Sequence, residues 1–278
     1  MIPTVRSHTG ARMPVLGMGT WTMGEKPHRR AAEVAALQLG FDLGMTIVDT
    51  AEMYADGGAE EVVAEAVAGR RDEIFVVSKV LPENASREGT IQAAERSLRR
   101  LGTDRIDLYL LHWKGRRPLA ETLEAFALLA EQGKIRHYGV SNFDLCAMAC
   151  AEQLPGGPAI AANQILYHLC ERGPERKLIP RCVGRGIIVM AYSPLAQGKL
   201  GAKAALKKIA LRHGCSPEGV ALAWIVRHEG VVAIPMSANR DHVRGNTAAL
   251  TLKLTEEDLA DLDAAFPAPK RDVPLGMV

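Results

Sequence analysis

The sequence alternates short apolar runs with longer stretches of helical spacing, and this alternation restricts the possible folds more than any other feature. Eight apolar runs have the length of buried strands, at residues 16–19, 46–49, 74–79, 106–112, 135–141, 160–164, 187–192 and 231–235. Consecutive parallel strands need a crossover connection, which is usually a helix. The alternation therefore predicts a parallel sheet, and eight strand–helix units fit a closed (β/α)8 TIM barrel.

Helical spacing occupies the segments between these strands, at residues 28–43, 59–68, 87–101, 119–132, 144–153, 175–184, 216–228 and 241–250. Two more helical stretches, 202–213 and 256–265, exceed the eight-unit pattern and predict extra helices near the C-terminus. At the N-terminus, short strands around Thr9-Gly10 predict a small β-hairpin. Since no low-complexity linker or charge block interrupts the chain, residues 1–278 are predicted to form a single barrel domain.

Composition excludes several classes of partner. The formal net charge is only +2, which argues against nucleic acid or an acidic membrane surface as partner. No apolar run approaches the roughly 18 residues of a membrane span, and the N-terminus lacks the apolar core of a signal peptide. These features predict a cytoplasmic protein, and they leave its oligomeric state open.

The cysteine count argues against structural staples. Five cysteines with no Cys-x-x-Cys pair predict neither a disulfide framework nor a metal site. Cys146 and Cys150 lie four residues apart, so a helix would place them on one face. We expect both to face the core as small apolar residues, and a redox role is the alternative.

Polar residues follow most of the predicted strands at the point where each strand ends. They are Asp49, Ser78-Lys79, His112, Ser141-Asn142, Gln164 and Tyr192-Ser193. Active sites of such barrels lie at the carboxyl ends of the strands. We therefore expect these side chains to converge at one rim of the barrel.

Four residues of this rim region combine into a proton-transfer site. The hydroxyl of Tyr54 has an ordinary pKa of about 10, and it becomes a useful acid when a cation such as Lys79 stabilises its anion. Asp49 can keep Lys79 charged and in place, and His112 can donate a hydrogen bond to a substrate carbonyl. Because side chains supply no hydride, such a site would need a nicotinamide or a flavin.

With these residues in this order, the chain resembles the aldo-keto reductase superfamily over nearly its whole length. The resemblance is carried by Met13-Pro14-Val15-Leu16-Gly17-Met18-Gly19-Thr20-Trp21, by Ile47-Val48-Asp49-Thr50-Ala51-Glu52-Met53-Tyr54 with Gly57 and Glu60, and by Ser78-Lys79, Leu111-His112-Trp113, Gly139-Val140-Ser141-Asn142-Phe143, Asn163-Gln164 and Ala191-Tyr192-Ser193-Pro194-Leu195. It implies an enzyme that reduces aldehydes or ketones with NAD(P)H. It also implies a catalytic tetrad of Asp49, Tyr54, Lys79 and His112.

The resemblance further implies the cofactor contacts. Ser141, Asn142 and Gln164 would bind the nicotinamide carboxamide, Tyr192 would stack on the ring, and Ser193 and Leu195 would approach the pyrophosphate. The other cofactor contacts that it implies are Gly19, Thr20, Trp21, Asp49, Ser237, His242 and Asn246. Gly17-x-Gly19 lacks the third glycine of a dinucleotide fingerprint, so we expect the nucleotide on barrel loops and not on a Rossmann domain.

One segment departs from the family pattern. Met236 replaces the lysine that usually meets the 2′-phosphate of NADP, His242 stands in the place of an arginine, and Gly245 stands in the place of a glutamate. The backbone N–H groups at the start of the next helix, or a cationic Arg240, Arg244 or His242, can compensate. We expect NADP(H) to be preferred over NAD(H), with part of that preference lost.

The substrate pocket is predicted from the same resemblance. Its walls would be Trp21, Met53 and Trp113 around Tyr54 and His112, which suits a small aldehyde or ketone. The loops that would cover it are short, and they predict a shallow, open site. The basic residues Lys114, Arg116 and Arg117 either attract anionic carbonyl compounds or belong to a solvated loop.

Two other functions are compatible with the barrel. Lys79 could act as a Schiff-base nucleophile in a lyase or aldolase, although Asp49 disfavours the neutral amine that this chemistry needs. The chain could also be a non-catalytic, nucleotide-binding accessory subunit. The sequence does not identify the physiological substrate or the favoured direction of reaction.

Overall fold

The computed structural model describes residues 3–200 and 204–278, and its centre is a parallel barrel. Eight strands follow one another in sequence order around the sheet: β3 (Met18–Gly19), β4 (Ile47–Asp49), β5 (Phe75–Val80), β6 (Ile106–Leu111), β7 (Ile135–Ser141), β8 (Ile160–Leu166), β9 (Ile188–Tyr192) and β10 (Val231–Ala233). The barrel closes where Gly17 N–H donates to Ala233 O at 2.9 Å and Gly19 N–H donates to Pro235 O at 3.0 Å. The predicted fold class is confirmed.

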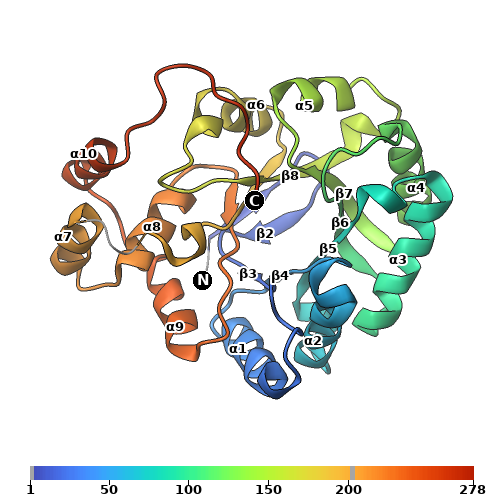
Figure 1. The fold of residues 1–278 in the computed structure, drawn as a ribbon, viewed down its shortest axis with the longest axis horizontal. Helices are drawn as coiled ribbons and strands as arrows, with labels where there is room; N and C mark the ends of the chain where they lie inside the picture. Colours follow the sequence, from blue (N-terminus) through green and yellow to red (C-terminus); the bar gives the residue numbers. More distant parts are fainter. Residues whose placement is uncertain (1–2, 201–203) are drawn as a thin grey trace.

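Helices surround the barrel (Figure 1). They are α1 (Arg30–Asp42), α2 (Gly58–Val67), α3 (Arg87–Leu101), α4 (Leu119–Glu131), α5 (Leu145–Ala151), α6 (Leu178–Gly184), α8 (Pro217–Val226) and α9 (Arg240–Ala248). The two extra helices are α7 (Ala204–His213) and α10 (Glu256–Ala265). Residues 202–203 of the predicted stretch 202–213 lie outside the described residues.

Predicted and observed ends differ by a few residues for physical reasons. Asp144 is not helical but caps α5, because its carboxylate accepts the N–H of Ala147 at 2.8 Å. The segment Gly173–Arg176 forms a separate 3-10 turn, so α6 begins later than expected. Pro235 cannot donate a ladder hydrogen bond, and β10 ends before it.

The N-terminal hairpin forms as predicted from β1 (Thr4–Arg6) and β2 (Arg12–Pro14). Its Ala11 and Met13 side chains are fully buried and pack against residues of the barrel interior such as Leu108 and Val232. The hairpin therefore contributes to the core inside the sheet.

The expectation for the helix-stacked cysteines is wrong. Both Cys146 and Cys150 are exposed, while Met148 and Ala151 of the same helix are buried. Residue 148 lies about 200° around the helix from residues 146 and 150, since successive residues are about 100° apart. Met148 thus directs the opposite face of α5 toward the core.

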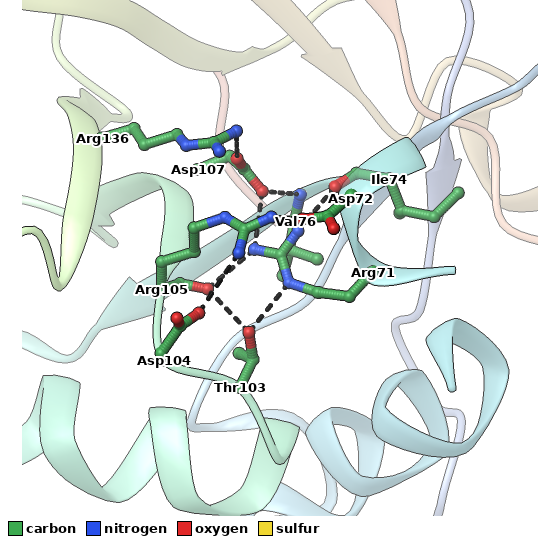
Figure 2. Close-up of polar contacts among 9 residues, drawn as sticks. All are labelled: Arg71, Asp72, Ile74, Val76, Thr103, Asp104, Arg105, Asp107 and Arg136. Atoms are coloured by element: carbon green, nitrogen blue, oxygen red, sulfur yellow. Dashed lines mark hydrogen bonds and ion pairs between the residues drawn. The ribbon is translucent and has the colours of Figure 1, made fainter. Parts of the chain in front are cut away.

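A buried carboxylate joins the amino ends of three neighbouring strands (Figure 2). Asp107 of β6 is 1% exposed and accepts hydrogen bonds from Arg71 Nη2 at 2.7 Å, the Val76 N–H at 2.9 Å and Arg136 Nη1 at 2.8 Å. Val76 belongs to β5 and Arg136 to β7. This end of a (β/α)8 barrel generally serves stability.

Among residues 3–200 and 204–278, no helix is both long and apolar enough to cross a membrane.

Candidate active site

The predicted polar residues converge at the carboxyl ends of the strands. Asp49 ends β4, Ser141 ends β7 and pairs in register with Gln164 of β8, and Tyr192 ends β9. His112 follows β6 directly, and its N–H donates to Val80 O of β5 at 3.0 Å. Parallel pairing brings these residues to one rim, as the sequence predicted. Ser78 was expected there as well, but its hydroxyl donates to Glu60 of α2 and its side chain does not line the cavity.

Lys79 lies below this rim and is completely buried. Its ammonium donates to Asp49 Oδ1 at 2.7 Å, to Thr50 O at 2.7 Å and to the Tyr54 hydroxyl at 3.2 Å. An ammonium has three N–H donors, so each one has an acceptor. Tyr54 and Asp49 line the cavity above this group, whereas Lys79 does not reach it.

Burial and charge act in opposite directions on this group. Burial raises the pKa of Tyr54 above its ordinary value, and Asp49 adds to this, while Lys79 lowers it. Burial alone would lower the pKa of Lys79, but Asp49 and Tyr54 raise it overall. The site therefore holds a protonated tyrosine beside a charged lysine, and the expected net lowering of the tyrosine pKa is absent in the free protein.

His112 is a neutral group in this setting. Burial, followed by the charge of Lys79, lowers the pKa of His112 to about 2. Its ring lies 5.8 Å from the Tyr54 ring and 4.8 Å from the Trp113 ring, between centroids. Within the described part of the chain, its buried Nδ1 has no hydrogen-bond partner. A neutral imidazole can donate a hydrogen bond through its one N–H, but it lacks the acidic second proton of an imidazolium.

A chain of amide and hydroxyl groups continues from Asp49 along the rim. Gln164 Nε2 donates to Asp49 Oδ2 at 2.6 Å, and Ser141 Oγ donates to Gln164 O at 2.9 Å. Asn142 Nδ2 donates to His112 O at 3.0 Å, and Asn142 Oδ1 accepts from the Tyr192 hydroxyl at 2.8 Å. These bonds fix the rotamers of the residues that the resemblance assigns to the nicotinamide.

A single cavity of about 820 Å³ spans this rim. Its walls contain every predicted site residue except the buried Lys79: Gly19, Thr20, Trp21, Asp49, Met53, Tyr54, His112, Trp113, Ser141, Asn142, Gln164, Tyr192, Ser193, Leu195, Ser237, His242 and Asn246. The volume lies at the upper end of the range for small-molecule and cofactor sites. Residues that are far apart in sequence thus form one continuous surface.

Sequence reasoning missed several wall residues, among them Gln197, Leu200, Glu218, Met277 and Val278. Loop length predicted a shallow site, yet the tail reaches the cavity and adds Met277 and Val278 to its walls. Figure 1 shows the tail passing from α10 to the centre of the barrel. None of these residues belongs to a motif, so the sequence held no signal for them.

Strained backbone accompanies the cavity. Thr22, Asn142, Ser193 and Gln197 line it with positive φ angles of 69°, 60°, 47° and 55°. Non-glycine residues pay a free-energy cost for this conformation, and such residues cluster at functional sites. The strained backbone therefore supports the assignment of this rim as the end of the barrel that carries the functional site.

The cavity wall near Met236 and the start of α9 does not offer all the phosphate-binding groups that the sequence predicted. The Asn239 side chain caps α9 and accepts the N–H groups of Asp241 and His242 at 2.8 and 3.4 Å, so these donors are already engaged. Met236 and His242 line the cavity, but Arg240 and Arg244 do not. Of the proposed cationic replacements for the missing lysine, only His242 lies at the cavity wall.

Fold and site together define the class of protein. It is an enzyme on a (β/α)8 barrel whose rim presents a protonated tyrosine, backed by a buried cation, to a large cavity.

Comparison with known proteins then identifies the family. The sequence model of the Aldo/keto reductase family matches residues 15–266. "Methylglyoxal reductase YeaE" of Escherichia coli (strain K12) is 52% identical over 271 residues, which cover 96% of this chain and 95% of the relative. "Glyoxal reductase" of Bacillus subtilis (strain 168) is 34% identical over 263 residues, covering 94% and 92%. The chain belongs to the aldo/keto reductase family, and the predicted family is confirmed.

A solved structure agrees closely. The crystal structure of an aldo/keto reductase from Klebsiella pneumoniae in complex with NADP and acetate has 47% sequence identity and a TM-score of 0.97, and the match covers 100% of both chains. The prediction of an oxidoreductase of the aldo-keto reductase type is therefore confirmed as well.

Proposed function

We propose that this protein reduces small, uncharged dicarbonyl compounds of the 2-oxoaldehyde type with NADPH, and that Tyr54 supplies the proton. The observation that carries the proposal is the Lys79 ammonium, which donates to both Asp49 and the Tyr54 hydroxyl in a fully buried position. The relatives named as methylglyoxal and glyoxal reductases support the substrate class. The neighbour crystallised with NADP supports the cofactor.

The cavity volume of about 820 Å³ lies within the range of cofactor sites, and its walls carry polar groups along their whole length. Ser141, Asn142, Gln164 and Tyr192 would hold the nicotinamide end, while Ser193 and Leu195 would approach the pyrophosphate. Ser237, His242 and Asn246 would contact the adenosine end of the cofactor. Gly19, Thr20 and Trp21 would lie nearer the nicotinamide ring. When bound, NADPH supplies the hydride that no side chain can supply.

Residues of this chain would orient the carbonyl oxygen of the substrate and protonate it. The Tyr54 hydroxyl gives its proton to that oxygen, and the phenolate that remains is stabilised by the ammonium 3.2 Å away. Asp49 keeps Lys79 charged. Neutral His112 would orient the carbonyl by donating a hydrogen bond to its oxygen, which needs no change in protonation.

The same geometry argues against a Schiff-base lyase. That chemistry requires a neutral lysine amine that can reach the substrate. Lys79 is completely buried, is held charged by Asp49 and has an acceptor for each N–H. An accessory, nucleotide-binding role would leave the buried Lys79–Tyr54 pair without a use.

The substrate class follows from the wall chemistry. Trp21, Met53, Trp113 and Met277 provide apolar surface, and among the described wall residues there is no lysine or arginine. The described acidic wall residues are Asp49, Glu218 and Asp241. Lys114, Arg116 and Arg117 do not line the cavity. An uncharged carbonyl compound is therefore favoured over a 2-oxo acid.

We further propose that residues 1–278 act as one domain in the cytoplasm, without a nucleic-acid partner. All five cysteines are free, including the exposed Cys146 and Cys150, which suits a reducing compartment. The small net charge offers little attraction to nucleic acid.

A substrate panel tests the proposal. NADPH oxidation is followed with methylglyoxal and glyoxal, and with pyruvate and glyoxylate as anionic counterparts of similar size. We expect kcat/KM at least about tenfold higher for the neutral pair, since burying an unpaired carboxylate costs several kcal/mol. Equal or higher values for the acids would contradict the proposed substrate class, and no turnover with any carbonyl compound would contradict the proposed reaction.

A further inference from the structure

Two buried carboxylates flank Tyr54 in the sequence. Glu52 precedes it by two residues and is 9% exposed, and Glu60 follows it by six residues and is fully buried. Neither side chain lines the cavity, so neither can touch a substrate there. Burying a carboxylate is unfavourable unless its partners are well placed. The partners of both carboxylates include groups of β5 or its exit, close to Lys79.

Glu60 connects helix α2 to the strand that carries Lys79. Its Oε1 accepts the Ser78 hydroxyl at 2.6 Å, and its Oε2 accepts Arg100 Nε at 2.6 Å. Successive strand residues point to opposite faces of a sheet. Ser78 therefore faces the helix layer while Lys79 faces the barrel interior. The Glu60–Ser78 hydrogen bond thus limits the rotation of β5 about its own axis, and with it the direction in which Lys79 points.

Glu52 holds the same strand on the other side of Lys79. Its Oε1 accepts the backbone N–H of Leu81 at 2.8 Å and Asn84 Nδ2 at 2.9 Å. The two carboxylates thus bracket Tyr54 in the sequence, and they bind β5 and its exit immediately before and shortly after Lys79.

The turn that follows Tyr54 needs such support. Ala55 and Asp56 both have φ angles of 51°, and Gly57 has a φ of 92°. A Cβ atom on Gly57 would lie 2.4 Å from Arg100 Nε, so the Arg100 side chain packs directly on this glycine. The Glu60–Arg100 pair therefore presses against the strained turn that leads out of Tyr54.

We propose that Glu60, assisted by Glu52, is a positioning residue that fixes the distance between the Tyr54 hydroxyl and the Lys79 ammonium. This inference rests on the proposed function, because it concerns the same proton transfer. It explains why charge is buried here, since a buried ion pair contributes little net stability compared with apolar packing. The two carboxylates act through Tyr54 and Lys79 and not on the substrate.

Ser78→Ala provides the cleanest test, because it removes only the hydroxyl that Glu60 grips. We expect kcat for methylglyoxal to fall between about 10-fold and 100-fold, as for small misplacements of catalytic groups. NADPH affinity, measured by fluorescence, should stay within about twofold, because Ser78 does not reach the cavity. Glu60→Ala should cause at least the same loss, whereas Glu60→Gln should retain most of kcat, because its amide oxygen can still accept from Arg100 Nε while its NH2 group donates to the Ser78 hydroxyl oxygen.

Coupling to Lys79 separates positioning from general stability. In a Lys79→Met background, Ser78→Ala should cause no further loss of kcat, because the side chain that it positions is gone. A purely structural residue would lower kcat by the same factor in both backgrounds, and that result would overturn the proposal. Asp107→Asn is the matched control, since it alters a buried carboxylate at the opposite end of the barrel and should leave kcat unchanged.

The outcomes also separate this inference from the proposed function. If Tyr54→Phe or Lys79→Met keeps wild-type turnover, the proposed reaction fails and the inference fails with it. If both lose activity while Ser78→Ala keeps wild-type kcat, only the positioning role is wrong. Ser78→Ala decides the question even if Glu60→Ala does not fold.

Discussion

Lys79 places an ammonium under the proposed proton donor, at 3.2 Å from its oxygen. Burial raises the pKa of Tyr54, and the charge of Lys79 acts against this by lowering it. Lys79→Met removes the cation, so the pKa of Tyr54 should rise further. Reduction needs protonated Tyr54 and is lost as pH rises through that pKa. The alkaline limb of kcat is therefore expected to move to higher pH, with a lower kcat. Steady-state rates across the alkaline range measure this, and an unchanged limb in an active variant would break the link between the two residues.

Met236 tests the cofactor end of the cavity. It is 41% exposed and lies at the cavity wall, and the family resemblance predicts that residue 236 faces the 2′-phosphate of NADP. Met236→Lys should tighten NADP(H) binding and leave NAD(H) binding unchanged, because the two cofactors differ only in that phosphate. An exposed ion pair contributes about 0.2–1 kcal/mol, or up to about fivefold in affinity, and added salt should weaken it. Fluorescence titrations with both reduced cofactors measure the effect. Equal changes for the two would show that residue 236 does not face the ribose.

Residues of the site were predictable from the sequence where they follow strands. Asp49, Lys79 and His112 interrupt or end apolar runs, so their placement at the rim follows from the topology of a parallel barrel. The rise in the pKa of Tyr54 that burial causes was not predictable, because the depth of a side chain depends on packing from distant segments. Glu218 and Leu200 were not predictable either, since they lie in segments without a strand-end motif.

At the scale of elements, strands and helices were predictable because apolar periodicity and capping residues agree. Ser86, Ser216 and Thr255 each cap a helix by accepting a backbone N–H with the side chain. The face that a short helix turns inward was not predictable, as α5 shows. With seven residues it has too few turns for a clear apolar stripe, and packing of Met148 decides the orientation.

The Asp107 network in Figure 2 gives a prediction about β5, β6 and β7. Asp107→Ala leaves the buried Val76 N–H without its acceptor, which costs about 1–3 kcal/mol in the free energy of unfolding. Asp107→Asn keeps one acceptor oxygen and should cost less. Urea unfolding compares the two variants with the wild type. Equal stability of Asp107→Ala and wild type would show that the network does not hold the strand ends together.

At the scale of the whole molecule, the barrel brings groups from most of the chain into one cavity, and the tail extends that cavity. Arg172 holds the start of the tail by donating to Phe266 O at 2.6 Å, and Arg176 donates to Asp272 at 3.0 Å. These bonds join residues more than 90 positions apart. Periodicity reports only on near neighbours in sequence, so the course of the tail could not be inferred from it.

The central claim is that the barrel presents Tyr54 as the acid for carbonyl reduction, and Tyr54→Phe tests it most directly. The variant keeps the aromatic ring that packs 5.0 Å from Trp21, so the cavity should keep its shape. Turnover of methylglyoxal with NADPH is measured alongside NADPH binding by fluorescence. We expect the rate to fall roughly 10²- to 10⁴-fold, with NADPH affinity within about twofold of wild type. A variant that keeps more than about half of the wild-type rate would show that Tyr54 is not the proton donor.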